Sequence, residues 1–286
     1  MKQRFFHFIF LSISISLLFS CGSNNGKAEV DPKSDSVAGP VVDSNNLRVF
    51  TLPAPLQVAT LLKSEKLAYN EKLLVPSRKA KVEYPSNYIR ALNLGVYTID
   101  LAYATVYEQH QTTLNYVNTM QSLVQELGIS SGVSGSMVKR FENNIKKQDS
   151  LYHIILQAYS QANAYFQNNK REEVGMYILS GSYLEGLYIS LHYKEIPNNM
   201  ILRNLIGQQK LFLENIVELL QYTEDKPETV DLLRKLMIIK KEFDQIPVIY
   251  DDSDKGRVAV KCTVSQQQLV SMLSKVIEIR NGIIMN

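Results

Sequence analysis

The apolar positions of this chain mark two helices that are hydrophobic on every side. The first runs from Asn87 to Tyr107, where only Arg90 and Asp100 are charged. The second runs from Glu172 to Tyr193 and opens with acidic residues, which suit a helix N-terminus. A helix without a polar face has to be buried by its neighbours. The pattern therefore predicts two central helices with the rest of the chain packed around them.

Most other apolar positions after Leu47 recur with the spacing of amphipathic helices. At His110 the chain either turns or continues as a helix, and the turn sequence DDSDKG allows a short hairpin between 246 and 264,. The amphipathic helices are expected to run from about His110 to Leu127, Met137 to Asn168, Pro197 to Tyr222, Pro227 to Ile246 and Ser265 to Ile279. We therefore expect one all-α domain over 47–286, a bundle of about seven or eight helices.

Glycines inside the two central helices predict that these helices approach each other closely. Gly95 lies in the first helix, and Gly175 and Gly181 lie in the second. Each glycine weakens a helix by about 1 kcal/mol, so a tight helix crossing is one explanation and irregular space to be filled is another. The spacing Gly-x-Tyr-x5-Tyr also occurs in both helices, ending at Tyr103 and at Tyr183. This echo indicates either a duplicated helical hairpin or a chance similarity.

The first 46 residues have the composition of a leader followed by a tether. Residues 1–20 place Lys2 and Arg4 before an apolar run from Phe5 to Phe19, which is the layout of a secretory signal peptide. The run is short and interrupted by serines, whereas a membrane-spanning helix needs about 20 apolar residues. Residues 22–46 are rich in Gly, Ser, Asn, Asp and Pro and contain no aromatic residue. Together with Cys21 they are expected to form a flexible tether.

The end of this leader, Leu18-Phe19-Ser20-Cys21, resembles the lipobox of bacterial lipoproteins. The resemblance implies that a peptidase cuts before Cys21 and that acyl chains such as palmitate anchor the new N-terminus in a membrane. An uncleaved anchor and a plain secretory signal are the alternatives. Because Gly22 follows the cysteine, the chain is similar to lipoproteins sent to the outer membrane, so we expect the domain to face the periplasm. The stretch ALNLGVYTIDLAYA is also similar to uncharacterised helical lipoproteins of Gram-negative bacteria, which implies no activity.

The charge balance argues against nucleic-acid binding, and the cysteine content argues against an intramolecular disulfide. Without Lys2 and Arg4, 29 of the 31 basic side chains remain against 28 acidic ones, so no electrostatic footprint for nucleic acid is expected. If Cys21 carries lipid, Cys262 has no partner for an intramolecular disulfide,. We expect Cys262 to be a small buried side chain.

Two carboxylates interrupt the apolar central helices and are the sharpest chemical signal in the chain. Asp100 and Glu185 must be paired, metal-bound or protonated if they are buried. One interpretation is a structural hydrogen bond to a buried tyrosine, and the other is a ligand site. Tyr103 and Tyr183 lie on the same helices and could line such a site or only pack the helices. The candidate ligand-binding residues are thus Asp100, Glu185, Tyr103 and Tyr183.

No catalytic constellation, cofactor motif or metal site is expected. Gly-Ile-Ser-Ser-Gly at 128–132 has the letters of a nucleophile elbow without the strand-turn-helix context. Glu185 and His192 share a helix face, but the paired Glu-x-x-His sequences of di-iron proteins are missing,. We therefore expect a non-enzymatic binding or scaffold protein of the envelope, with membrane lipid and an envelope protein as partners. The alternative is a helical domain, with or without enzyme activity, that binds a small ligand or metal at Asp100 and Glu185.

Overall fold

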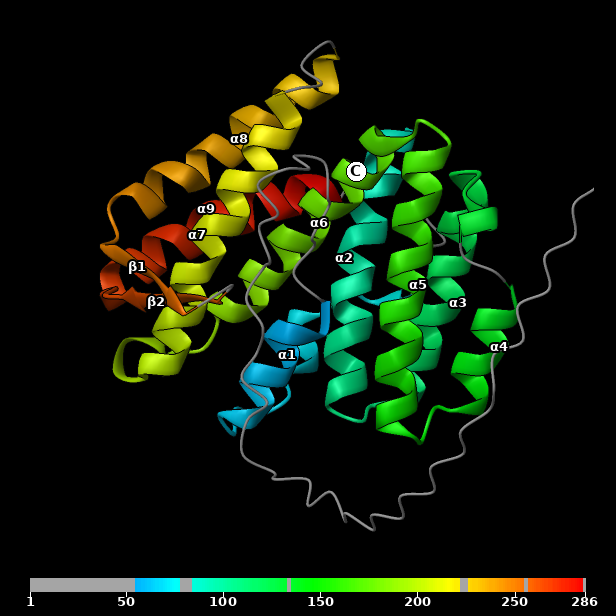
Figure 1. Cartoon of the computed structure of the whole chain (residues 1–286), viewed down its shortest axis with the longest axis horizontal. Helices are drawn as coiled ribbons and strands as arrows, with labels where there is room; N and C mark the ends of the chain where they lie inside the picture. The colour runs from blue at the N-terminus through cyan, green and yellow to red at the C-terminus, as the bar shows by residue number, and fades with distance from the viewer. Residues whose placement is uncertain (1–54, 78–83, 133–134, 222–225, 255–256, 285–286) are drawn as a thin grey trace, which may run out of the picture. The chain divides into compact units, whose positions relative to one another are not determined.

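The computed structural model describes residues 55–77, 84–132, 135–221, 226–254 and 257–284. The expected leader, Cys21 and tether therefore lie outside the described residues. Among the described residues the fold is all-α, with nine α-helices and one two-stranded sheet (Figure 1). The helices are α1 Pro55–Ser64, α2 Asn87–Val106, α3 His110–Glu126, α4 Gly135–Asn143, α5 Gln148–Asn168, α6 Glu172–Leu191, α7 Met200–Gln221, α8 Pro227–Asp244 and α9 Gln266–Ile284.

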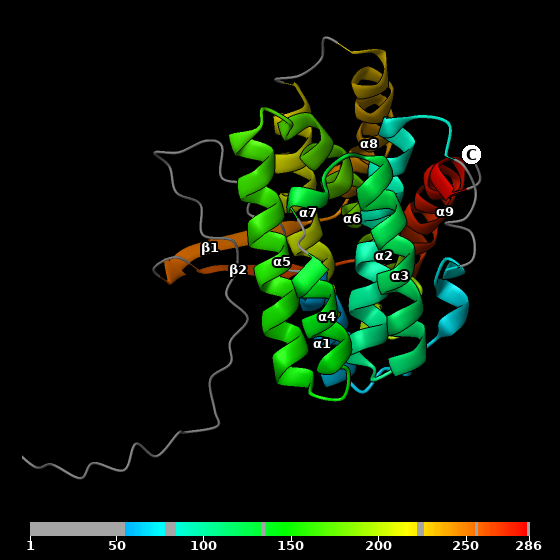
Figure 2. The same cartoon turned by 90° about the vertical axis from the view of Figure 1, so that its right-hand side faces the viewer.

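The two helices that the sequence places at the centre, α2 and α6, are confirmed there. They lie against each other in parallel, because the ring of Tyr88 contacts Tyr177 near their starts and the Tyr103 hydroxyl contacts Tyr193 beyond the end of α6. Figures 1 and 2 show α3, α4 and α5 on one side of this pair and α7, α8 and α9 on the other. Each central helix is therefore covered by neighbours on nearly every face.

Two glycines set the distance between α2 and α6. A Cβ atom on Gly95 would lie 2.0 Å from the carbonyl oxygen of Ile178, and one on Gly181 would lie 2.0 Å from that of Leu92. The backbones touch directly, and the Ser182 hydroxyl donates a hydrogen bond of 3.1 Å to the Gly95 carbonyl. The expected tight crossing thus uses Gly95 and Gly181. Gly175 instead faces the ring of Phe166 on α5.

The helix boundaries differ from the expectation at one junction and complete it at another. The single helix expected over 137–168 is two helices, α4 and α5. Between them Asn144 donates its side-chain amide to the Arg140 carbonyl, a local bond through which asparagine competes with helix continuation. At the other junction the chain turns between α2 and α3, where Glu108 takes a φ of 60°.

The C-terminal part contains the hairpin that the DDSDKG turn allows. Strands β1 Val248–Asp254 and β2 Arg257–Cys262 pair antiparallel, with Val248 opposite Cys262. Cys262 is buried, and burial raises the pKa of its thiol to about 11. It is therefore a packing residue, as expected. In the part of the chain that the structure describes, no helix is long and apolar enough to cross a membrane.

Candidate functional site: a buried ionic cluster and an apolar pocket

Asp100 and Glu185 are brought together between the two central helices, and both are fully buried. Their partner is Arg280 of α9, which donates to both Glu185 oxygens, from Nε over 2.5 Å and from a terminal nitrogen over 2.7 Å. Such a two-point pair holds the guanidinium and the carboxylate in one plane. We call Asp100, Glu185 and Arg280 the ionic cluster.

Arg280 is the member of this cluster that sequence reasoning missed. The last helix was expected to end near Ile279, but α9 continues to Ile284. Val276 lies four residues before Arg280, and Ile283 lies three residues after it; both are buried. This spacing puts Arg280 on the apolar stripe of α9. A charged residue within an apolar stripe is the signal that could have identified it.

Arg280 also contacts two groups besides Glu185. The guanidinium donates a hydrogen bond of 3.1 Å to the Leu73 carbonyl, and its carbon lies 3.9 Å from the centroid of the Tyr188 ring. This contact has the geometry of a cation–π interaction. The cluster therefore ties α9, α6 and the segment around Leu73 together.

Asp100 is the member of the cluster whose protonated form is favoured by its surroundings. Its Oδ2 accepts a hydrogen bond of 3.0 Å from the Val75 amide. Burial, followed by the neighbouring Glu185 carboxylate, raises the pKa of Asp100 well above its usual range, and Arg280 opposes this only in part. Desolvation and a nearby like charge both disfavour the ionised form of Asp100.

The two candidate tyrosines are engaged in packing. The Tyr103 hydroxyl accepts a hydrogen bond of 3.0 Å from the Asn70 amide and lies 2.6 Å from the Tyr193 hydroxyl. Tyr183 is buried on α6, and its hydroxyl has no hydrogen-bond partner among the described residues. Burial raises the pKa of Tyr183 well above its ordinary value. None of the four sequence-predicted residues lines the pocket described next.

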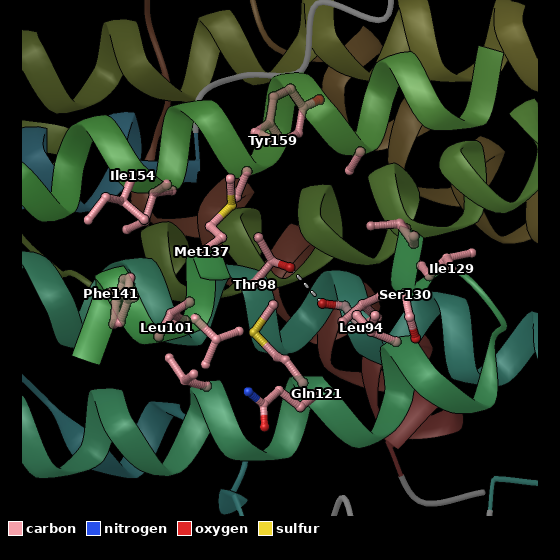
Figure 3. Close-up of a pocket in the computed structure, with 18 of the residues that line it drawn as sticks. Leu94, Thr98, Leu101, Gln121, Ile129, Ser130, Met137, Phe141, Ile154 and Tyr159 are labelled. Atoms are coloured by element: carbon pink, nitrogen blue, oxygen red, sulfur yellow. Dashed lines mark hydrogen bonds between the residues drawn. The ribbon is translucent and has the colours of Figure 1, made fainter. Parts of the chain in front are cut away.

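A pocket of about 370 Å³ lies among α2, α3, α4, α5 and α6 (Figure 3). We call it the apolar pocket, because most of its lining is aliphatic or aromatic. Leu94, Thr98 and Leu101 line it from α2, and their spacing of four and three residues puts them on one face of that helix. Ile178 lines it from α6. Thr98 and Ile178 are only half-buried, although they belong to the two central helices.

The two ends of the apolar pocket differ in polarity. Figure 3 shows Phe141, Leu101 and Ile154 at one end and Ser130 toward the other. The first three are buried, whereas Ser130 is exposed. We call these the closed end and the open end.

Helix directions place further polar residues at the open end. The end of α3 lies beside the start of α2, because Glu126 pairs with Arg90 over 2.9 Å. Exposed Gln125 on α3 therefore lies toward the open end. The start of α5 lies beside the end of α2, because Gln148 donates to the Val106 carbonyl over 3.1 Å. Asn163, near the end of α5, thus also lies toward the open end.

Two polar groups deeper in the pocket already have hydrogen-bond partners. The Thr98 hydroxyl donates a hydrogen bond of 2.7 Å to the Leu94 carbonyl (Figure 3), and Ser182 donates to Gly95. The described residues that line the apolar pocket include no Asp, Glu, Lys, Arg, His or Cys. The arrangement is therefore suited to burying apolar surface of a ligand.

Sequence reasoning did not find the apolar pocket, because apolar residues that line a pocket and apolar residues that pack in a core have the same pattern. A partial signal is the row of small residues that faces the space. Ala158 and Ala162 line it from α5, and Gly175 lines it from α6. Small side chains on facing helices leave volume unfilled unless the helices close in.

Potential metal ligands do not cluster in the described part of the chain. No group of three or more His, Cys, Asp or Glu side chains there is placed to hold a metal ion. His192, on the same helix face as Glu185, has its Nδ1 2.7 Å from the Tyr188 carbonyl. Its ring is held by its own helix.

Comparison with known proteins does not assign this chain to a family. No family model, no curated protein and no solved structure matches it. The function therefore has to be argued from the chemistry of the site.

Proposed function

We propose that this protein is a lipid-anchored, non-enzymatic binding protein of the cell envelope whose helical domain holds a small apolar molecule. The apolar pocket carries the proposal. Its volume of about 370 Å³ lies within the range of about 300–1,000 Å³ that small-molecule sites occupy. An apolar cavity of about 150 Å³ already takes up benzene. The space is therefore large enough for a specific ligand.

The lining supports binding without catalysis. General acid–base and nucleophilic catalysis use His, Cys, Lys, Asp or Glu side chains that touch the substrate, and the pocket lining has none of these. Each square ångström of apolar surface that a ligand buries contributes about 25 cal/mol. Affinity in such a pocket comes from shape and apolar area.

The ionic cluster is the alternative ligand site, and its geometry supports a structural role. Both Glu185 oxygens are bonded to Arg280, and Asp100 is bonded to the Val75 amide. A ligand would have to displace a buried guanidinium to reach the Glu185 carboxylate. We assign to this cluster the task of fixing α9 against α6.

The proposal of a membrane anchor rests on the leader sequence. The lipobox-like Leu18-Phe19-Ser20-Cys21 and the polar stretch 22–46 support a domain tethered to the outer membrane and facing the periplasm. Two or more acyl chains give stable membrane anchoring where one chain is marginal. The bound molecule would then be taken up from the periplasm or the membrane surface.

The test is native mass spectrometry of the chain Gly22–Asn286, produced in the periplasm without its lipid and purified without detergent. We expect extra mass that organic solvent removes. Ala162→Phe places a ring in the pocket and should abolish the extra mass. Ala164→Phe is the matched control, because Ala164 is exposed on the same helix and does not line the pocket.

Two results would contradict the proposal. One is a bare protein mass together with no uptake of an apolar dye such as Nile red. The other is equal ligand binding by Ala162→Phe and Ala164→Phe, which would place the ligand elsewhere. Chemical cross-linking of the lipidated protein in cells then tests the scaffold role through a protein partner.

A further inference from the structure

The lining of the apolar pocket extends along one helix. It follows α5 from Ile154 to Phe166, which is about 18 Å at the helical rise of 1.5 Å per residue. A pocket of about 370 Å³ with a lining of this length accommodates an extended hydrocarbon chain.

The polarity of the lining changes along the pocket, and this change predicts which way round a ligand lies. The closed end offers only apolar side chains, among them Phe141, Leu101 and Ile154. Toward the open end the lining gains Gln125, Ser130 and Asn163. A molecule that satisfies both ends has an apolar tail and a head that forms hydrogen bonds.

The head group that suits the open end is uncharged. Among the residues that the structure describes, no charged side chain lines the apolar pocket. The guanidinium of Arg171, at this end, is already bonded to the carbonyls of Leu127 and Gly128 over 2.9 and 3.2 Å. These carbonyls end helix α3, where the helix dipole is negative and disfavours an anion. Side-chain amides and hydroxyls instead match hydroxyl or ester groups.

We infer that the ligand is a single-chain amphiphile with an uncharged, hydroxyl-bearing head, bound with its chain toward Phe141 and its head toward Ser130. This inference rests on the proposed function and specifies its ligand. Glycerol monoesters of fatty acids have this chemistry. A cavity of about 150 Å³ holds benzene, which has six carbon atoms. On the same scale the apolar pocket of about 370 Å³ holds on the order of 15 non-hydrogen atoms.

The test compares three amphiphiles that share a ten-carbon chain and differ in the head. Glycerol monodecanoate is neutral, decanoate is anionic and decyltrimethylammonium is cationic. Each is titrated calorimetrically into the delipidated chain Gly22–Asn286, below the concentration at which it forms micelles. We expect glycerol monodecanoate to bind at least about tenfold more tightly than either ion, because only its head forms hydrogen bonds without leaving a charge unpaired.

Two variants locate the head group. Gln125 lines the pocket toward its open end, and Gln125→Leu should weaken the binding of glycerol monodecanoate about three- to tenfold by removing one hydrogen-bonding partner of the head group. Its matched control is Asn118→Leu, an exposed position on α3 outside the lining. That control should bind as the parent does.

The other possible outcomes overturn different parts of the proposal. Equal binding of all three amphiphiles, or preference for decanoate, overturns the uncharged head while the proposed apolar ligand stands. Uptake of Nile red without uptake of any amphiphile overturns the chain-shaped ligand in the same way. If neither the dye nor any amphiphile binds, and the native mass is that of the protein alone, the proposed function itself is wrong.

Discussion

The ionic cluster and the apolar pocket lie on different faces of the same central helix. Asp100 follows Thr98 by two residues, and at 3.6 residues per turn the two side chains point to nearly opposite sides of α2. On the Asp100 side the protein supplies partners for the buried charges, through Arg280 and the Val75 amide. On the Thr98 side the apolar surface faces open space. Unfilled apolar volume is thus a better pointer to a ligand here than buried charge.

The largest effect is expected from breaking the ionic cluster. Arg280→Met leaves Glu185 as an unpaired buried carboxylate, which should lower the free energy of unfolding by about 3–5 kcal/mol. Urea denaturation followed by circular dichroism measures the loss. The double variant Arg280→Met/Glu185→Leu should recover most of it, since no charge then stays buried. Equal loss in the single and double variants would show that the charges are not coupled.

The next effect comes from forcing the central helices apart. Gly95→Leu places a side chain where a Cβ alone lies 2.0 Å from the Ile178 carbonyl oxygen. Overpacking of this kind costs about 1–3 kcal/mol, and contact with backbone favours the upper end. Thermal denaturation should show a lower melting temperature. Gly282→Ala is the control, because its Cβ would meet nothing within 4 Å and alanine favours a helix more than glycine does. It should keep or raise the melting temperature, and an equal loss there would contradict crowding as the cause.

A smaller effect is expected on the pH dependence of stability, and it comes from Asp100. The pKa of Asp100 is raised by folding, above an unfolded value of about 3.9. The folded state therefore holds this proton after the unfolded state has lost it, and stability falls as the pH rises above about 4. Because asparagine does not titrate, Asp100→Asn should remove the fall in stability that the Asp100 carboxyl causes. Urea denaturation at pH 5 and pH 8 should show a smaller difference for the variant than for the parent, and an unchanged difference would mean that Asp100 is ionised in the fold.

The smallest effect is expected in the apolar pocket. Ala162→Phe fills existing space, so the free energy of unfolding without ligand should change by no more than about 0.5–1 kcal/mol. Differential scanning calorimetry of the ligand-free protein measures this. Ala164→Phe serves as the exposed comparison. A loss of several kcal/mol in Ala162→Phe alone would show that the space is packed in solution and is not a pocket.

Much of the fold was predictable because it depends on local patterns. The all-round apolar stretches predicted α2 and α6, and the glycines predicted their close crossing, although the crossing uses Gly181 and not Gly175. The helix break between α4 and α5 was missed because a short polar interruption such as the one around Asn144 looks the same on an exposed helix face. Boundaries of this kind are decided by which face finds a partner.

The site was predictable only in part. Sequence reasoning required that Asp100 and Glu185 be neutralised if they were buried, and the structure buries both. It considered a tyrosine, a histidine or a ligand as the partner, whereas Arg280 lies 95 residues after Glu185. A pairing over that distance depends on how whole helices pack.

The sequence by itself determined most of the helical segments, which two of them are central and which buried groups need a partner. These properties follow from side-chain spacing and from the cost of burying charge. The tertiary structure decided that Arg280 is that partner and that Leu94, Thr98 and Leu101 face a pocket while their neighbours on α2 face other helices. Both depend on long-range packing, because only the assembled helices determine which apolar surfaces meet and which stay apart.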